Sequence, residues 1–314
     1  MCENSSIVIR NKAAVLPWPR MASLIYHAGA LGDFITTLPA MSAWRRLHRS
    51  ERIILLGKPA HGALAPRGLF DETWEAGASQ FAPLFGSGVE RDSALGARLS
   101  AFHSALLFCS ASSPLGSNLV RVGVGEMLRQ EPFPAERVPI IDYHLSLFPG
   151  LALTETDRQP QVSCSDAIFP VPAMTAALHP GSGDARKNWP LAKFRELAET
   201  LEAAGWAVRW VLGPAEEGLA LPAGAETWRN LRLPDAAAAL TACKAFVGND
   251  SGITHLAAAC GCATVALFGA TDPVVWAPCG QAVALLRAPG GLLEGLSSEA
   301  VFRKVLVSCG AETF

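Results

Sequence analysis

Short apolar runs alternate with amphipathic stretches along the first half of the chain. The first apolar run ends at Tyr26, a glycine-containing turn follows, and an amphipathic stretch continues to His48. Further apolar runs occupy residues 52–57 and 103–110. Strands that alternate with helices explain this pattern, and such alternation predicts a parallel sheet. We therefore predict a Rossmann-like α/β domain that begins near residue 21.

The same alternation begins again near residue 173, after a polar connection. Residues 150–172 contain three prolines and many polar side chains, which is typical of an interdomain segment. The pattern then predicts strands ending near 179 and at 206–213, 245–249 and 263–269, and helices at 191–205, 235–244, 253–261 and 297–309. We predict two Rossmann-like domains with parallel sheets that face each other across a cleft. Their expected bounds are an N-terminal extension at 1–20, an N-terminal domain at 21–160, and a C-terminal domain with a terminal helix at 161–314.

The composition limits the classes of protein open to this chain. Its formal net charge is -2 and it has no block of basic residues, so we expect no nucleic-acid partner. Charges interrupt every apolar stretch before the about 18 to 20 residues that a membrane span needs, and the start lacks the layout of a signal peptide. The eight cysteines are scattered without zinc-ligand spacing, which favours buried thiols. We expect a cytoplasmic protein.

The turn in "FVGNDSGITHLAAACG", residues 246–261, joins a predicted strand to a predicted helix. Asp250, Ser251 and Gly252 lie at the helix start, where unpaired N–H groups favour an anion such as a diphosphate. Ligands of parallel sheets bind at this carboxyl end of the strands. The residues leave two interpretations open, a ligand site and the ordinary cap of a buried helix. A metal site formed by Asp250 and His255 is disfavoured, because two ligands make no site.

Two further turns carry candidate chemistry. In "HPGSGDARKNWP", residues 179–190, small residues around Ser182 and the cation of Lys187 could cradle phosphate, although the spacing is not that of a Walker P-loop. In "GALGD", residues 29–33, a carboxylate stands at a helix start. Because it would repel a phosphate, we expect Asp33 to face a neutral hydroxyl as a general base. The alternative is a carboxylate that only stabilises the helix terminus.

These three turns, together with "ATDPVVWAPCG" at 270–280, resemble glycosyltransferase family 9, the bacterial heptosyltransferases of lipopolysaccharide assembly. The resemblance implies a GT-B fold with a nucleotide-sugar donor, ADP-heptose or a related compound, held mainly by the C-terminal domain. It implies a lipid-linked or oligosaccharide acceptor held by the N-terminal domain. It also implies that neither a cofactor nor a metal is required.

The resemblance assigns roles to individual residues. Asp33 corresponds to the catalytic aspartate of the family, and Lys187 to a lysine that contacts the diphosphate of the donor, with Ser182 beside it. The family motif D-[ST]-G-x-x-H, which meets the diphosphate and the sugar, falls on Asp250, Ser251, Gly252 and His255. A carboxylate on the ribose hydroxyls corresponds to Glu216 or Glu217. By spacing, Leu231 to Leu233 lie near the wall of the adenine site.

The N-terminal half departs from the family pattern. His27 stands where many members have Lys or Arg, so a fixed positive charge near the acceptor is missing. Basic residues that could face the acceptor instead are Lys58, Arg67 and Arg121, and ordinary surface charges are the alternative interpretation for all three.

The expected reaction is an inverting displacement without metal, in which Asp33 deprotonates the acceptor and Lys187 stabilises the departing diphosphate. Two alternatives stay open. The chain could be a GT-B nucleotide-sugar epimerase, or a nucleotide-sugar-binding protein that has lost transfer. We also expect peripheral contact with the inner membrane, because the acceptor of the family is lipid-linked.

Overall fold

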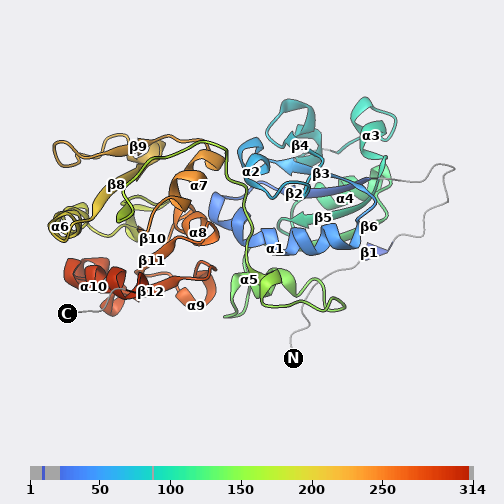
Figure 1. Ribbon diagram of the computed structural model, residues 1–314. Coiled ribbons are helices and arrows are strands. Elements are labelled where there is room, and N and C mark those ends of the chain that lie inside the picture. The colour runs from blue at the N-terminus through green and yellow to red at the C-terminus, as the bar shows by residue number, and fades with distance from the viewer. Residues whose placement is uncertain (1–8, 11–21, 87, 311–314) are drawn as a thin grey trace.

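The computed structural model describes residues 9–10, 22–86 and 88–310, which form two α/β domains side by side (Figure 1). The first sheet has the strand order β1-β6-β5-β2-β3-β4, and the second has the order β12-β11-β10-β7-β8-β9. All neighbouring strands are parallel except β1, which pairs antiparallel with β6. The predicted fold class is confirmed.

The N-terminal domain contains the first sheet and the helices around it. Its strands are β1 (Ile9–Arg10), β2 (Ala22–His27), β3 (Arg52–Gly57), β4 (Glu72–Glu75), β5 (Phe102–Phe108) and β6 (Glu126–Gln130). Its helices are α1 (Leu31–Leu47), α2 (Pro59–Leu64), α3 (Ala94–Leu99), α4 (Leu115–Val122) and α5 (Ile140–Leu145), with 3₁₀ helices at Ser79–Phe85 and Thr156–Arg158.

The C-terminal domain contains the second sheet. Its strands are β7 (Thr175–His179), β8 (Ala207–Leu212), β9 (Thr227–Arg229), β10 (Ala245–Asn249), β11 (Ala263–Phe268) and β12 (Val283–Arg287). Its helices are α6 (Leu191–Ala203), α7 (Leu233–Thr241), α8 (Gly252–Ala259), α9 (Pro273–Trp276) and α10 (Ser298–Ser308). Short 3₁₀ helices lie at Ala185–Lys187, Pro214–Glu216, Pro289–Gly291 and Leu293–Gly295.

The expected domain bounds can be compared with these elements. The first sheet ends with Gln130 of β6 and the second begins with Thr175 of β7, so the predicted boundary at residue 160 lies between the sheets and remains a prediction. Within the predicted extension 1–20, residues 9–10 form the edge strand β1, and the other residues lie outside the described part of the chain. No helix among the described residues is both long and apolar enough to cross a membrane.

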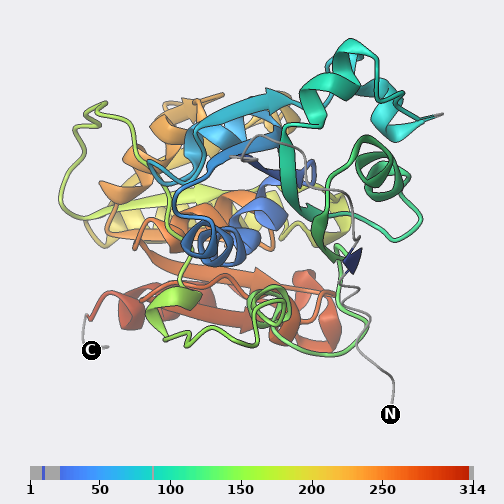
Figure 2. The same cartoon turned by 90° about the vertical axis from the view of Figure 1, so that its right-hand side faces the viewer.

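The long helix α1 runs along the N-terminal domain, with its start at the C-terminal domain (Figure 1), and Figure 2 shows it in blue at the centre of the molecule. Phe34 in the first half of α1 and Trp44 near its end both belong to the core of the N-terminal domain. Ile35 belongs to a different core, which contains Phe246 and Leu256 of the C-terminal domain. The helix therefore buries apolar side chains in both domains, and this packing holds the start of α1 against α8.

Candidate active site

The first turns of α1 and α8 meet where the two sheets face each other (Figure 1). A Cβ atom added to Gly252 would lie 2.8 Å from Cβ of Leu31 and 3.0 Å from N of Gly32, so only glycine fits there. A Cβ atom added to Gly32 would lie 3.3 Å from Cδ2 of His255. Since Asp33 is the next residue in α1, the structure brings the "GALGD" turn and the D-S-G-x-x-H motif together.

Asp33 occupies the first turn of α1. Its Oδ2 atom accepts a hydrogen bond of 3.1 Å from the N–H group of Ala30, which holds the side chain at the helix terminus. The carboxylate lies at the positive end of the helix dipole. A carboxylate that is fixed in this way and remains partly exposed can accept a proton from a bound hydroxyl group.

Lys187 and Asp250 form an ion pair that joins the two turns of the C-terminal domain. The Nζ atom of Lys187 lies 2.8 Å from Oδ2 of Asp250. The side chain of Asp250 is 8% exposed and that of Lys187 is 35% exposed, so the lysine is the partner that lies nearer to solvent. An ammonium group has three donors, and this pair uses one of them. Lys187 therefore keeps donors for an anion at the start of α8.

Ser251 combines a capping role with its place in the motif. It is the N-cap of α8, and its Oγ atom accepts a hydrogen bond of 3.4 Å from the N–H group of Thr254. The earlier N–H groups of a helix have no intrahelical partner and remain available to a ligand. Capping by Ser251 thus leaves N–H groups that could bind an anion, so the cap does not decide between the two interpretations of this turn.

Asn249 connects the two turns, a role that the sequence motifs did not indicate. Its side chain is fully buried at the end of β10. Its Oδ1 atom accepts a 2.8 Å hydrogen bond from the N–H group of Trp189, and its Nδ2 atom donates to the carbonyl oxygen atoms of Pro180 at 2.9 Å and Gly181 at 3.3 Å. The only signal in the sequence was a polar residue at the end of an apolar strand. Asn249 fixes the position of the Lys187 turn relative to the start of α8.

We expect the Asn249→Ala variant to lose about 3 kcal/mol of unfolding free energy, because it leaves three buried backbone groups without partners. Urea denaturation monitored by circular dichroism measures this loss. The exposed Gln161→Ala is the control and should change the unfolding free energy by no more than about 0.5 kcal/mol. A loss for Asn249→Ala as small as that of the control would contradict the bridging role.

Glu216 and Glu217 have different surroundings. Glu216 is buried, and its Oε2 atom accepts a 2.7 Å hydrogen bond from the N–H group of Gly213. It lines a cavity of about 320 Å³ together with Ser182. Glu217 is exposed and accepts a 3.0 Å hydrogen bond from Asn230. Of the two carboxylates considered from the sequence, the structure places Glu216 in the pocket with Ser182.

Ser182 is held by its own turn. Its Oγ atom lies 2.7 Å from the carbonyl oxygen of Asp184 and 2.6 Å from Oδ1 of Asn188. The hydroxyl proton is therefore engaged within the loop, which fixes the shape of the backbone around Gly181 and Gly183. The contribution of this segment to a ligand would come from its backbone N–H groups.

An apolar pocket of about 210 Å³ lies beside α8. Its apolar walls include Val211, Trp228, Leu231, Leu233 and Ile253. Ile253 follows Gly252 directly, so the pocket adjoins the start of α8. Its size and apolar lining could accommodate a nucleobase, and it contains both ends of the Leu231 to Leu233 segment that we expect near adenine.

His255 is a buried neutral imidazole between charged groups. Burial lowers its pKa, and the charge of Lys187 acts in the same direction. The carboxylates of Asp250 and Asp33 act in the opposite direction and raise the pKa. A neutral ring offers one N–H donor and one acceptor. His255 is suited to hydrogen bonding with sugar hydroxyl groups rather than to supplying a positive charge.

His27 and Lys58 lie close to the Asp33 turn. Burial, together with smaller effects of the neighbouring His61, His144 and Lys58, lowers the pKa of His27 to about 3, so this ring is neutral near pH 7. His27 therefore carries no positive charge, so the charge that Lys or Arg has at this position in many family members is absent here. The Nζ atom of Lys58 donates a 2.8 Å hydrogen bond to the carbonyl oxygen of Gly29. Lys58 brings a cation to this turn from the end of β3.

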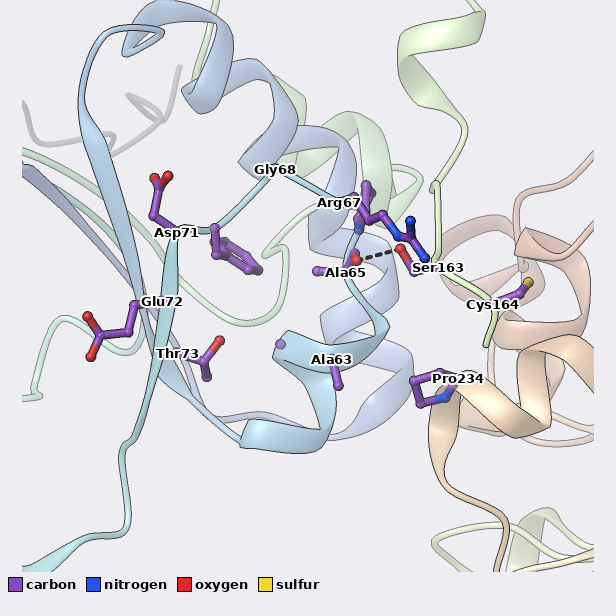
Figure 3. A pocket seen from close by; sticks show the side chains of 13 residues that line it. Ala63, Ala65, Arg67, Gly68, Asp71, Glu72, Thr73, Ser163, Cys164 and Pro234 are labelled. Carbon is purple, nitrogen blue, oxygen red and sulfur yellow. Dashed lines mark hydrogen bonds between the residues drawn. The ribbon is translucent and has the colours of Figure 1, made fainter. Parts of the chain in front are cut away.

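The structure does not bring Arg67 and Arg121 together with Asp33. Arg67 lies in the loop between α2 and β4, where it lines a cavity of about 430 Å³ with Ser163 and Cys164 (Figure 3). Arg121 lies in the last turn of α4 with its guanidinium group against Gly88. Segments that follow a helix and precede a parallel strand lie at the amino edge of the sheet. Asp33 lies at the carboxyl edge.

Comparison with solved structures defines the class of fold. A glycosyl transferase of family 9 from Veillonella parvula superimposes with a TM-score of 0.73 and 14% identity, over 92% of this chain and 97% of that chain. The Escherichia coli ADP-heptose lps heptosyltransferase II superimposes with a TM-score of 0.69 and 19% identity, over 92% of this chain and 98% of that chain. The two facing domains therefore have the GT-B fold of the glycosyltransferases.

Sequence comparison gives the family. Residues 134–303 match the profile described as Glycosyltransferase family 9 (heptosyltransferase), which is more than half of the chain. The protein belongs to glycosyltransferase family 9. The matched region contains both turns of the C-terminal domain, whereas Asp33 lies before it. The resemblance inferred from the motifs is thus confirmed.

Two curated relatives show how far the sequence similarity extends. Lipopolysaccharide heptosyltransferase 1 of Pseudomonas aeruginosa is 42% identical over 93 residues, which cover 28% of this chain and 26% of that protein. Lipopolysaccharide heptosyltransferase 2 of Salmonella typhimurium is 32% identical over 155 residues, which cover 45% of this chain and 43% of that protein. The chain thus spans less than half the length of these curated relatives.

Proposed function

We propose that the protein is an inverting, metal-independent glycosyltransferase that moves a heptose from ADP-heptose to a lipopolysaccharide-type acceptor. One observation carries the proposal. The carboxylate-bearing start of α1 lies against the start of α8, beside the Lys187–Asp250 ion pair. A proton acceptor and an anion site therefore face the same space. The names of the relatives and of the structural neighbours support heptose as the sugar.

The donor would bind along the C-terminal domain. Its adenine enters the apolar pocket beside Ile253, and the ribose hydroxyl groups reach the carboxylate of Glu216. The diphosphate meets the start of α8, where N–H groups and the dipole favour an anion. Lys187 then directs its remaining donors to the diphosphate oxygen atoms. His255 and Asp250 contact the sugar.

The transfer would proceed as a single displacement. A lone pair of the acceptor hydroxyl attacks the anomeric carbon while Asp33 takes up the hydroxyl proton. The bond between the anomeric carbon and the diphosphate oxygen breaks from the opposite face, and its electron pair leaves with ADP. Lys187 and the start of α8 stabilise the charge that develops on this leaving group. These groups perform the electrostatic role that a divalent ion has in other transferases.

The acceptor would bind to the N-terminal domain. The neutral rings of His27 and His61 and the cation of Lys58 lie on that side of Asp33. An acceptor attached to lipid places the protein in the cytoplasm at the inner face of the inner membrane.

A transfer assay tests the function. The protein is incubated with ADP-heptose and a lipopolysaccharide core acceptor, and mass spectrometry and NMR follow the products. We expect one added heptose with inverted anomeric configuration, at a rate that is the same with and without added Mg²⁺ or Mn²⁺. An isomeric nucleotide sugar formed from the donor alone would indicate an epimerase. Tight donor binding without turnover across a panel of acceptors would indicate a binding protein.

A further inference from the structure

Three potential metal ligands meet at the amino edge of the first sheet. His48 follows the last residue of α1, Glu51 precedes β3, and His103 is the second residue of β5. One ligand atom of each residue lies within 4.8 Å of the other two. Asp33 lies near the opposite end of α1, so this cluster is distinct from the candidate active site.

A single carboxylate oxygen connects the two rings. The Oε1 atom of Glu51 lies 2.9 Å from Nδ1 of His48 and 3.2 Å from Nε2 of His103. These separations are close to the about 3.4 Å between two ligand atoms on one tetrahedral zinc ion. The second oxygen atom, Oε2, is buried and has no hydrogen-bond partner among the described residues. A buried carboxylate oxygen without a partner is costly unless a cation or donor meets it.

The hydrogen bond of the other His103 nitrogen defines its tautomer. Nδ1 of His103 lies 3.0 Å from the carbonyl oxygen of Ala22, which can only accept, so Nδ1 carries the hydrogen. In the neutral ring the lone pair of Nε2 then points towards the carboxylate of Glu51. Two lone pairs at 3.2 Å repel each other unless a cation lies between or beside them. Only a proton or a metal ion can fill this role.

We propose that His48, Glu51 and His103 bind a zinc ion. Two imidazoles and one carboxylate form a ligand set that zinc accepts, with water in the fourth position. The hydrogen bond from His103 to Ala22 is the kind of support that orients a metal-bound imidazole. The side chains are 9%, 18% and 27% exposed, in the order His48, Glu51 and His103, so an ion can enter from solvent.

The surrounding structure holds the ligands in place. The Nη1 atom of Arg45 donates a 2.7 Å hydrogen bond to the carbonyl oxygen of Glu51, and the ring of Trp44 lies 4.0 Å from that of His48 between centroids. The ion would join the end of α1 to the starts of β3 and β5. Its role would be to stabilise the N-terminal domain. The site is independent of the proposed transfer reaction.

Metal binding to the whole chain tests this site. The protein is stripped with a chelator and titrated with Zn²⁺, while elemental analysis and thermal unfolding are measured. We expect one bound ion and a higher melting temperature, because a ligand that binds only the folded state stabilises it. Co²⁺ in place of zinc should give visible absorption of a tetrahedral site without thiolate charge transfer, which separates this site from any that uses cysteine.

Variants assign the ligands. Glu51→Gln and His103→Ala should each weaken zinc binding at least about tenfold. Glu75→Gln, a change to an exposed carboxylate of the same domain, should bind zinc like the parent. Circular dichroism of the metal-free variants shows whether each is folded. Absence of stoichiometric zinc in the parent, or equal affinity in a folded Glu51→Gln, would overturn the proposal and leave a hydrogen-bonded histidine–glutamate cluster. Neither outcome bears on the transfer assay.

Discussion

We expect the Asp33→Asn variant to lose most sugar transfer while donor binding persists. The amide keeps an oxygen that can accept the hydrogen bond from the N–H group of Ala30, so the start of α1 should retain its structure. It cannot take up the proton of the acceptor hydroxyl. Loss of a general base typically costs about 10²- to 10⁴-fold in rate. Single-turnover transfer from ADP-heptose measures the loss, and calorimetric titration with ADP measures binding.

Asp92→Asn is the matched control for this experiment. Asp92 is an exposed aspartate of the same domain, remote in sequence from the turns that form the site, and its variant should transfer at the parental rate. A parental single-turnover rate for Asp33→Asn would remove Asp33 from the proposed mechanism. A loss of ADP binding together with the loss of transfer would indicate a structural role for Asp33 instead.

The sequence predicted those parts of the fold and site that depend on local pattern. Each of the three turns follows an apolar strand and precedes a helix, so its place at the carboxyl edge of a sheet follows from hydrophobic periodicity alone. The role of Asn249 could not be predicted in this way. Its partners are 60 to 69 residues away and become neighbours because β10 pairs with β7. A local sequence pattern does not indicate which strands become neighbours in the sheet.

The basic residues of the N-terminal domain illustrate the same limit. Lys58 and Arg67 are close in sequence, yet the short helix α2 between them separates the two edges of the sheet. Only the residue that directly follows a strand reaches the Asp33 turn. The histidine–glutamate cluster escaped the sequence analysis because His103 joins His48 and Glu51 through strand pairing, with Ala22 of β2 aligned between Arg52 and Phe102.

Lys187→Ala is the second change with a large expected effect. The variant lacks the cation that would neutralise charge on the departing ADP, and loss of one such electrostatic group typically lowers kcat by about 10²- to 10³-fold. Steady-state kinetics with ADP-heptose and an acceptor measures this change. Affinity for ADP, measured by calorimetry, should fall less than kcat/KM, because the charge is largest when the bond to the sugar breaks.

The ion pair with Asp250 complicates this experiment, because Lys187→Ala also leaves a nearly buried carboxylate without its partner. That carboxylate would repel the diphosphate of the donor, and the fall in kcat/KM would then be larger than the loss of the cation alone causes. The double variant Lys187→Ala with Asp250→Asn, compared with each single variant in a cycle, separates this repulsion from the missing cation.

Lys244→Ala, at an exposed lysine of the same domain, should leave the kinetics unchanged. If Lys187→Ala reduces ADP affinity as much as kcat/KM, the lysine contributes to donor binding alone, and the stabilisation of the leaving group must come from the start of α8.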